Sequence, residues 1–275
     1  LNYQFSTINY QLSTVNYQLS TINYMKTAFI TGASSGIGEA CARKFAENGY
    51  RLILNARNEQ KLQAVADGLK KEFGTEVLTL LFDVREREVA RKAIETLPNE
   101  WKAIDVLVNN AGLALGLEKE YVGDFADWDT MIDTNIKALL SITRFVVPMM
   151  VERGKGHIIN IGSVAGDVAY PNGAVYCATK AAVKTLSDGL RMDLVDTPLR
   201  VTTIKPGLVE TNFSVVRFHG DKERADNVYK GINPLTGKDI ADCVWFAASA
   251  PEHVQVAEIL VLATHQASGS LTYRK

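Results

Sequence analysis

The chain has 275 residues, of which 47% are hydrophobic and 22% charged, a composition that indicates a soluble globular protein with a sizeable core. Thirty Lys and Arg residues almost balance 31 Asp and Glu residues, so the charge gives no reason to expect nucleic acid or an anionic membrane as a partner. No continuous apolar run reaches the ~18 to 20 residues that span a bilayer. The three cysteines are widely spaced and the histidines lack metal-ligand spacing. We therefore expect a cytoplasmic protein with no disulfide framework and no metal site.

The first 24 residues repeat the seven-residue unit Asn-Tyr-Gln-Leu-Ser-Thr-Ile. The unit lacks the charges of a coiled coil, and the segment lacks the basic start and apolar core of a signal peptide. The heptanucleotide AACTATC, read three times in frame, translates into this unit. We therefore expect residues 1–24 to be translated upstream DNA without stable structure, a hypothesis that an intact mass including them would contradict. Residues 25–275, starting at Met25, would then form one domain. The alternative is a polar, β-prone arm that mediates assembly.

Beyond the repeat, short apolar runs alternate with segments of helical spacing. The apolar runs predict strands at 26–31, 51–55, 77–82, 106–108, 158–161, 201–204 and 258–262. The helical spacing predicts helices at 37–48, 59–73, 86–97, 127–153 and 174–194. Such an alternation predicts an α/β fold, a Rossmann-type doubly wound parallel sheet in a single domain. Residues 210–235 are expected to be mobile, because Gly, Pro, Asn and charged residues replace the regular pattern there.

A glycine-rich turn, Thr-Gly-Ala-Ser-Ser-Gly-Ile-Gly at 31–38, lies between the first predicted strand and the first predicted helix. In such a turn Gly32 permits the sharp bend, Gly36 lets the backbone approach a pyrophosphate, and Gly38 allows helix and strand to pack closely. The N-terminus of the helix adds free N–H groups and positive potential. The turn therefore predicts dinucleotide contacts from Gly32, Ser34, Ser35, Gly36, Ile37 and Gly38.

The end of the second predicted strand selects the dinucleotide. An NAD enzyme needs an acidic residue there for the ribose hydroxyls, but this chain has Ala56 followed by Arg57. A guanidinium suits a 2′-phosphate, so the sequence favours NADP; the alternative is that Arg57 is merely a surface arginine.

Two further segments suit an adenosine and its ribose. Asp83 and Val84 end the third strand, where the carboxylate can accept from the adenine amino group or instead cap the next helix. Asn110, Ala111 and Gly112 follow the fourth strand and let a ribose lie against the backbone. Asn109 can tie neighbouring strands together.

Tyr176 and Lys180 stand four residues apart on a predicted helix and so share one face, and Ser163 follows a predicted strand. A phenol with a pKa of about 10 exchanges protons poorly at neutral pH, but a nearby ammonium group and an oxidised nicotinamide would both lower that pKa. Tyr176 can then act as a general acid or base, with Ser163 hydrogen-bonding the carbonyl oxygen and Lys180 also holding the nicotinamide ribose. Ser163 lacks the Gly-x-Ser-x-Gly elbow, which disfavours a serine hydrolase.

Together, the T-G-x-x-x-G-x-G, N-N-A-G, Ser, Y-x-x-x-K and Pro-Gly segments resemble the short-chain dehydrogenase/reductases across residues 26–265. The resemblance implies that Asn135 is a fourth catalytic residue, holding a water that relays protons through Lys180. It also implies that the nicotinamide amide and the phosphates are bound by the segment 206–211, including Pro206, Gly207, Val209 and Thr211.

The segments at 97–101, 109–116, 127–135, 150–163 and 213–221 are similar to the bacterial NADP-dependent 3-hydroxy acid dehydrogenases. That resemblance implies a homotetramer that oxidises serine and related 3-hydroxy acids and reduces malonic semialdehyde and similar 3-oxo acids. Such a substrate needs a cation for its carboxylate. Arg217 is our candidate; the alternative is an arginine at the surface or at a subunit interface.

Two other functions stay open. A reductase of another carbonyl class, such as 3-oxoacyl-carrier-protein thioesters, should present a basic patch near the mouth of the site. The basic residues of 222–230 are instead interspersed with acidic ones. A non-catalytic NADP-binding protein should have lost Ser163, Tyr176 or Lys180, and all three are present.

Overall fold

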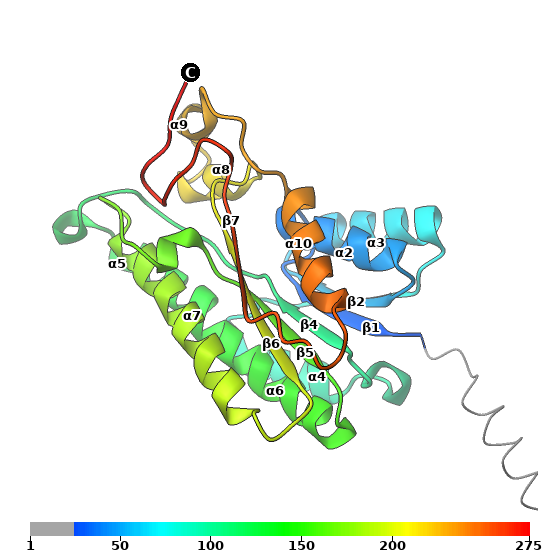
Figure 1. Ribbon diagram of the computed structural model, residues 1–275. Coiled ribbons are helices and arrows are strands. Elements are labelled where there is room, and N and C mark those ends of the chain that lie inside the picture. Colours follow the sequence, from blue (N-terminus) through cyan, green and yellow to red (C-terminus); the bar gives the residue numbers. More distant parts are fainter. Residues whose placement is uncertain (1–24) are drawn as a thin grey trace, which may run out of the picture.

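The computed structural model describes residues 25–275, and the heptapeptide repeat with the predictions made for it lies outside the described residues. The described chain builds one parallel sheet in the order β3-β2-β1-β4-β5-β6-β7 (Figure 1). The strands are β1 (Thr27–Thr31), β2 (Arg51–Ala56), β3 (Val77–Leu81), β4 (Val106–Asn109), β5 (His157–Ile161), β6 (Arg200–Pro206) and β7 (Glu258–Val261). The predicted Rossmann-type sheet is confirmed, and the predicted strands agree with these bounds within two residues.

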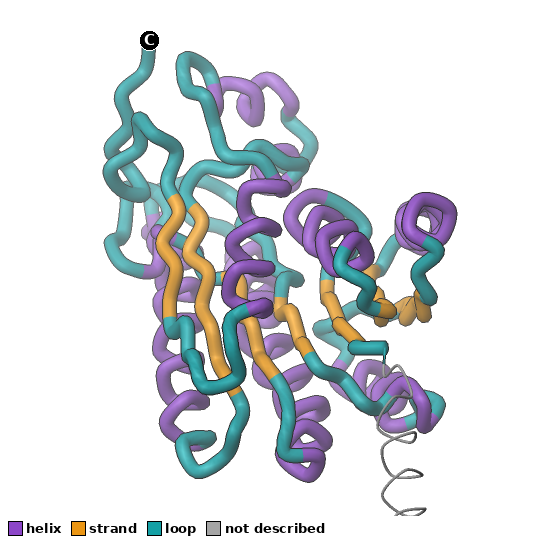
Figure 2. The backbone as a smooth tube through the Cα atoms, turned by 45° about the vertical axis from the view of Figure 1, so that its right-hand side comes forward, coloured by secondary structure: helices purple, strands orange, loops and turns teal. Residues whose placement is uncertain are grey.

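Helices cover both faces of the sheet (Figures 1 and 2). One face carries α2 (Gly36–Glu47), α3 (Glu59–Phe73) and α10 (Gly237–Ser249). The other face carries α4 (Arg87–Glu95), α6 (Leu139–Arg153) and α7 (Ala174–Asp193). The smaller elements are η1 (Asn99–Trp101), η2 (Glu120–Val122), α5 (Phe125–Ile132), the π-helix η3 (Asp133–Ala138), η4 (Val164–Gly166), α8 (Phe213–Arg217) and α9 (Lys222–Tyr229).

The inner strands are rich in apolar residues because both faces of the sheet are buried there. Phe29 and Ile30 are neighbours on β1, point to opposite faces, and are both fully buried, each in a different core cluster. A strand covered on one face only would alternate between apolar and polar residues. The two-sided burial therefore explains why the sequence shows runs rather than alternation.

The order of the strands fixes where a ligand can bind. The chain runs outward from β1 to β3 and then crosses back to place β4 on the other side of β1. Loops after neighbouring strands diverge at this reversal and leave a crevice at the carboxyl ends of the strands.

Three helices were not predicted. The 13-residue helix α10 begins at a capping box, in which Thr236 and Asp239 each accept from the other's backbone N–H, a signal that the sequence contains but that we did not use. Residues 210–235, which we expected to be mobile because they lack a regular sequence pattern, contain the short helices α8 and α9. Their mobility stays a prediction.

The helical run Phe125–Arg153 is long and apolar enough, by length and composition, to cross a membrane, which corrects our expectation that the chain has no such stretch. However, 56% of its apolar window is buried inside the protein. Ile142 and Val146 of α6 belong to the core cluster beneath the sheet. The run is therefore a core helix of the described fold.

Candidate active site

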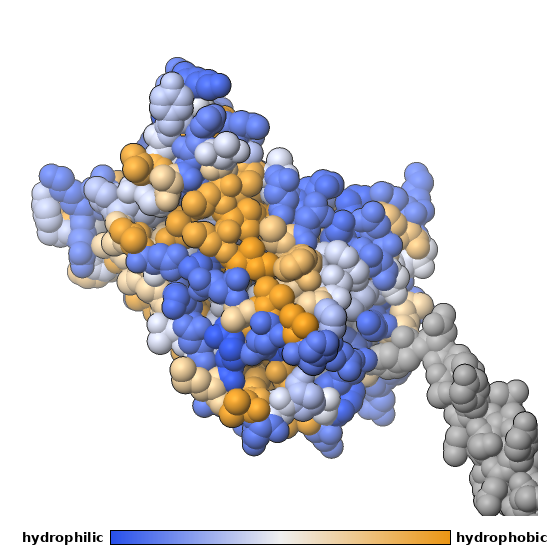
Figure 3. Space-filling view, in the orientation of Figure 1, coloured by the Kyte–Doolittle hydropathy of each residue, from blue (hydrophilic) through white to orange (hydrophobic). Residues whose placement is uncertain are grey.

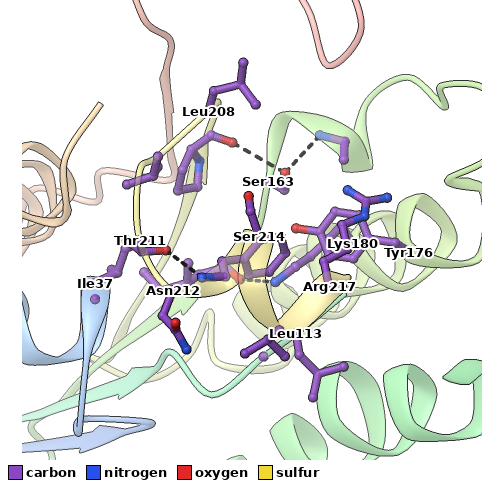
Figure 4. A pocket seen from close by; sticks show the side chains of 18 of the residues that line it. Ile37, Leu113, Ser163, Tyr176, Lys180, Leu208, Thr211, Asn212, Ser214 and Arg217 are labelled. Carbon is purple, nitrogen blue, oxygen red and sulfur yellow. Dashed lines mark hydrogen bonds between the residues drawn. The ribbon is translucent and has the colours of Figure 1, made fainter. Parts of the chain in front are cut away.

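A cavity of about 590 Å³ lies at the carboxyl ends of the strands. Nearly all of the predicted site residues line it, and Gly38 and Asn135 do not. Figure 4 shows side chains from segments far apart in the sequence around this cavity: Ile37 and Thr211 lie on one side, and Tyr176, Lys180 and Arg217 on the other.

The glycine-rich turn has the geometry that the sequence predicts. Gly32 and Gly36 have φ values of +65° and +59°, in the left-handed region that favours glycine. A Cβ on Gly38 would collide with the carbonyl oxygen of Gly32. Ser35, the N-cap residue of α2, makes no side-chain cap bond, which leaves the first N–H groups of the helix for an anion.

The Asn-Asn-Ala-Gly segment holds that turn in place. Asn110 donates from Nδ2 to the carbonyl oxygens of Thr31 at 2.9 Å and Gly32 at 3.1 Å. Asn109 donates from Nδ2 to Oδ1 of Asn160 at 2.9 Å, which confirms that it ties neighbouring strands together. The amide of Asn110 therefore shapes the floor of the cavity rather than pointing a free donor into it.

At the end of β2, Ala56 and Arg57 line the cavity together with Asp83. Asp83 forms ion pairs with Arg85 at 2.7 Å and with Arg57 at 3.3 Å. Burial opposes ionisation of Asp83, but the hydrogen bonds and charge of Arg85, and the charge of Arg57, outweigh it and lower the pKa of Asp83 to about 2. The N-cap residue of α4 is Glu86, so the alternative that Asp83 caps this helix was wrong. The adenine contact of Asp83 stays a prediction.

Tyr176 and Lys180 lie one turn apart on α7, and both side chains are buried. Ser163 is the N-cap residue of η4, directly after β5; its Oγ accepts from the N–H of Ala165 at 3.1 Å and donates to the carbonyl of Pro206 at 3.4 Å. Ser163, Tyr176 and Lys180 all line the cavity. The structure therefore brings the three predicted catalytic side chains together.

Lys180 is a buried ammonium group held by a neutral partner. Its Nζ donates to the carbonyl of Ile161 at 2.9 Å and lies 5.9 Å from the centroid of the Tyr176 ring. Burial penalises the charged form and lowers the pKa of Lys180 to about 8.

In the protein by itself, burial raises the pKa of Tyr176 above the ordinary value of a phenol, and the nearby Tyr170 adds to this. The Ser163 hydroxyl and the charge of Arg217 act in the opposite direction but are outweighed, so Tyr176 is a neutral phenol at neutral pH. The lowering that we expect with an oxidised nicotinamide bound stays a prediction.

Asn135 lies in the π-helix η3 and is buried behind the cavity wall. Its Oδ1 accepts from the N–H of Leu113 at 2.9 Å, and its Nδ2 donates to the Leu113 carbonyl at 2.8 Å and to Oγ1 of Thr179 at 3.0 Å. The side chain thus joins the loop after β4 to α7. Its predicted role in holding a water stays a prediction.

Arg217 ends α8 and points into the cavity beside Tyr176 (Figure 4). Its guanidinium donates from Nε to the carbonyl of Gly116 at 3.1 Å and from Nη1 to the Tyr170 hydroxyl at 3.0 Å. The N–H of Gly116 in turn donates to the Arg217 carbonyl at 3.0 Å. Arg217 is therefore not a free surface arginine, whereas the subunit-interface alternative is untested.

Several residues that line the cavity were not predicted from the sequence. Tyr170 lies between η4 and α7, and Gln266 and Arg274 come from the segment after β7. Gln266 accepts from the N–H of Leu208 at 2.8 Å and so fixes the segment after β6. Arg274 donates to the carbonyls of Lys230 at 2.7 Å and Val228 at 3.1 Å. No motif in the sequence marks these contacts, because each joins segments far apart in the chain.

Comparison with known proteins places this fold and site in a family. Residues 26–221 match the short chain dehydrogenase family. The chain is 49% identical to an NADP-dependent 3-hydroxy acid dehydrogenase of Salmonella typhi over 247 residues, which cover 90% of this chain and 98% of the relative. It is 45% identical to an enzyme of the same name from Schizosaccharomyces pombe over 251 residues, which cover 91% and 97% of the two chains.

Among solved structures, the closed form of a serine dehydrogenase complexed with NADP⁺ superimposes with a TM-score of 0.85 at 44% identity, covering 90% of this chain and 99% of that one. The serine dehydrogenase of Escherichia coli gives a TM-score of 0.76 at 41% identity, covering 88% and 99%. The chain therefore belongs to the short-chain dehydrogenase family.

Proposed function

We propose that this protein is an oxidoreductase that transfers a hydride between NADP(H) and a small 3-hydroxy or 3-oxo acid of the serine, 3-hydroxypropionate or malonic semialdehyde type. The observation that carries the proposal is the guanidinium of Arg217, whose central carbon lies 5.6 Å from the centroid of the Tyr176 ring inside the cavity. A cation at that place suits a substrate that carries a carboxylate one carbon atom away from its reacting carbon. The names of the relatives support the same substrate class.

The cavity fits NADP at its adenosine end. Ala56 supplies no carboxylate for a ribose diol, whereas the exposed side chain of Arg57 can reach a 2′-phosphate once it leaves Asp83. The uncapped start of α2 and the glycines before it suit a pyrophosphate. When bound, NADP(H) would supply the hydride chemistry. The residues of this chain would bind and orient the cofactor and the substrate, and move the proton.

Three side chains divide the proton chemistry among them. Tyr176, a neutral phenol, holds the proton that a carbonyl oxygen needs when it is reduced. The one bond that Ser163 donates within the described residues is a long one, 3.4 Å to the Pro206 carbonyl, so its hydroxyl proton can turn toward the substrate oxygen. The ammonium of Lys180 favours the phenolate that forms after Tyr176 gives up its proton. The same groups serve oxidation in reverse.

We further propose a cytoplasmic homotetramer. β7 is an edge strand on which Leu260 is exposed, and Phe246 of the neighbouring α10 is exposed as well. An apolar band runs over this edge of the molecule (Figure 3). An apolar sheet edge of this kind favours pairing with a second copy. Sedimentation equilibrium tests this, and a monomer would contradict it.

We predict that Arg217→Ala discriminates between charged and uncharged substrates. The kcat/KM ratio of malonic semialdehyde to propanal, which has the same chain length but no carboxylate, should fall by roughly 10- to 100-fold, because a charged hydrogen bond to the substrate is lost. NADPH-linked absorbance assays measure both values. An unchanged KM for malonic semialdehyde would remove Arg217 from the substrate pocket.

We predict that Ala56→Asp combined with Arg57→Leu moves the cofactor preference toward NAD. The new carboxylate can accept from ribose hydroxyls and repels a 2′-phosphate, and the cation for that phosphate is lost. The ratio of kcat/KM with NADP to that with NAD should fall by about 100-fold or more. No movement of this ratio would show that the end of β2 does not select the cofactor.

We predict a pH limit set by Lys180. Its pKa is lowered to about 8, so it is an ammonium below that pH and a neutral amine above it. For reduction of malonic semialdehyde, kcat/KM should therefore fall as the pH rises through about 8. In Lys180→Arg, whose side chain keeps its charge, this decline should disappear. A decline at the same pH in the arginine variant would assign it to another group.

A further inference from the structure

We propose that Tyr170 is a positioning residue that fixes the Arg217 guanidinium above the catalytic phenol and thereby sets the preference for carboxylate-bearing over uncharged carbonyl substrates. The proposal rests on the proposed function, because it takes Arg217 as the receptor of the substrate carboxylate.

The contacts of Arg217 leave its positive charge available to an anionic ligand. Its guanidinium carbon lies 5.5 Å from the centroid of the Tyr170 ring and 5.6 Å from that of Tyr176, within the range of cation–π attraction to both. Its two hydrogen-bond acceptors are the Tyr170 hydroxyl and the Gly116 carbonyl, and both are neutral. In the described part of the chain, no carboxylate forms an ion pair with Arg217. A guanidinium carries five N–H donors, so others remain for an anionic ligand.

Tyr170 is itself held tightly enough to serve as an anchor. A Cβ on Gly173 would collide with the Tyr170 ring, so the glycine permits this packing. On another side, a Cβ on Gly269, in the segment after β7, would meet the ring at 3.3 Å. Burial raises the pKa of the Tyr170 phenol, which outweighs the opposing charge of Arg217. The anchor therefore stays a neutral acceptor and does not neutralise the guanidinium.

This arrangement explains why Tyr170 should act on specificity rather than on the hydride step. A free arginine side chain loses rotamer entropy when a carboxylate binds to it, and an anchor that already holds the side chain reduces this loss. An uncharged carbonyl substrate does not use the guanidinium as a receptor. Loss of the Tyr170 hydroxyl should therefore weaken mainly the substrates that carry a carboxylate.

Tyr170→Phe removes the hydroxyl and keeps the ring. We expect the kcat/KM ratio of malonic semialdehyde to propanal to fall about tenfold, chiefly through a higher KM for malonic semialdehyde. The matched control is Tyr121→Phe, the same chemical change at a side chain that is 80% exposed and outside the cavity. A Tyr170→Phe enzyme that loses kcat/KM equally with both substrates would show a merely structural role and overturn the proposal.

A double-mutant cycle with Arg217→Met shows whether Tyr170 acts through Arg217. We expect the Tyr170→Phe change to leave the ratio unaltered when Arg217 is already methionine. A further tenfold fall in that background would overturn the proposal, because the hydroxyl would then act independently. If Arg217→Met lowers the ratio and Tyr170→Phe does not, only the role of Tyr170 fails. If Arg217→Met leaves the ratio unchanged, Arg217 does not bind the substrate carboxylate, and this part of the proposed function is contradicted.

Discussion

The active site depends on two cations, Lys180, which is buried, and Arg217, which is partly buried, and neither forms an ion pair with an acidic residue of the described chain. Lys180 and Arg217 lie 5.9 and 5.6 Å from the centroid of one buried phenol ring, and each is held by neutral oxygen atoms. Within the described residues, the cavity is lined by Arg57, Lys180, Arg217 and Arg274 against the single acid Asp83. The chain as a whole carries a net charge of −1, so this excess of cations is local. Phosphates and a carboxylate are the ligands that such a cavity favours.

The fold serves this site by bringing the segments after the strands to one edge of the sheet. Ser163 follows β5, the Pro206 segment ends β6, and the glycine-rich turn follows β1. Because helices cover both faces of the sheet, its strands stand out in the sequence as short apolar runs, and all of them were predicted within two residues. The helix α3 was predicted at its observed bounds, since Asn58 caps its start and Gly74, with φ at +65°, ends it.

The features of the structure that the sequence did not predict have physical explanations. Residues 210–235 mix turn-forming and charged residues, which concealed the short helices α8 and α9, whereas α10 was missed because its capping box was not used. The catalytic side chains were predictable because Tyr176 and Lys180 share one helical face. The contact of Arg217 with Tyr170 spans 47 residues, and no local pattern could predict it. The raised pKa of Tyr176 follows from burial, which appears only once the chain is folded.

The most direct test is an NADP(H)-linked absorbance assay over a panel of 3-hydroxy acids, 3-oxo acids and 3-oxoacyl thioesters. We predict NADP-dependent oxidation of serine or 3-hydroxypropionate and NADPH-dependent reduction of malonic semialdehyde. We also predict a lower kcat/KM for thioesters, which lack the free carboxylate that Arg217 would bind. A higher kcat/KM for the thioesters, or no turnover with any acid, would contradict the proposed function.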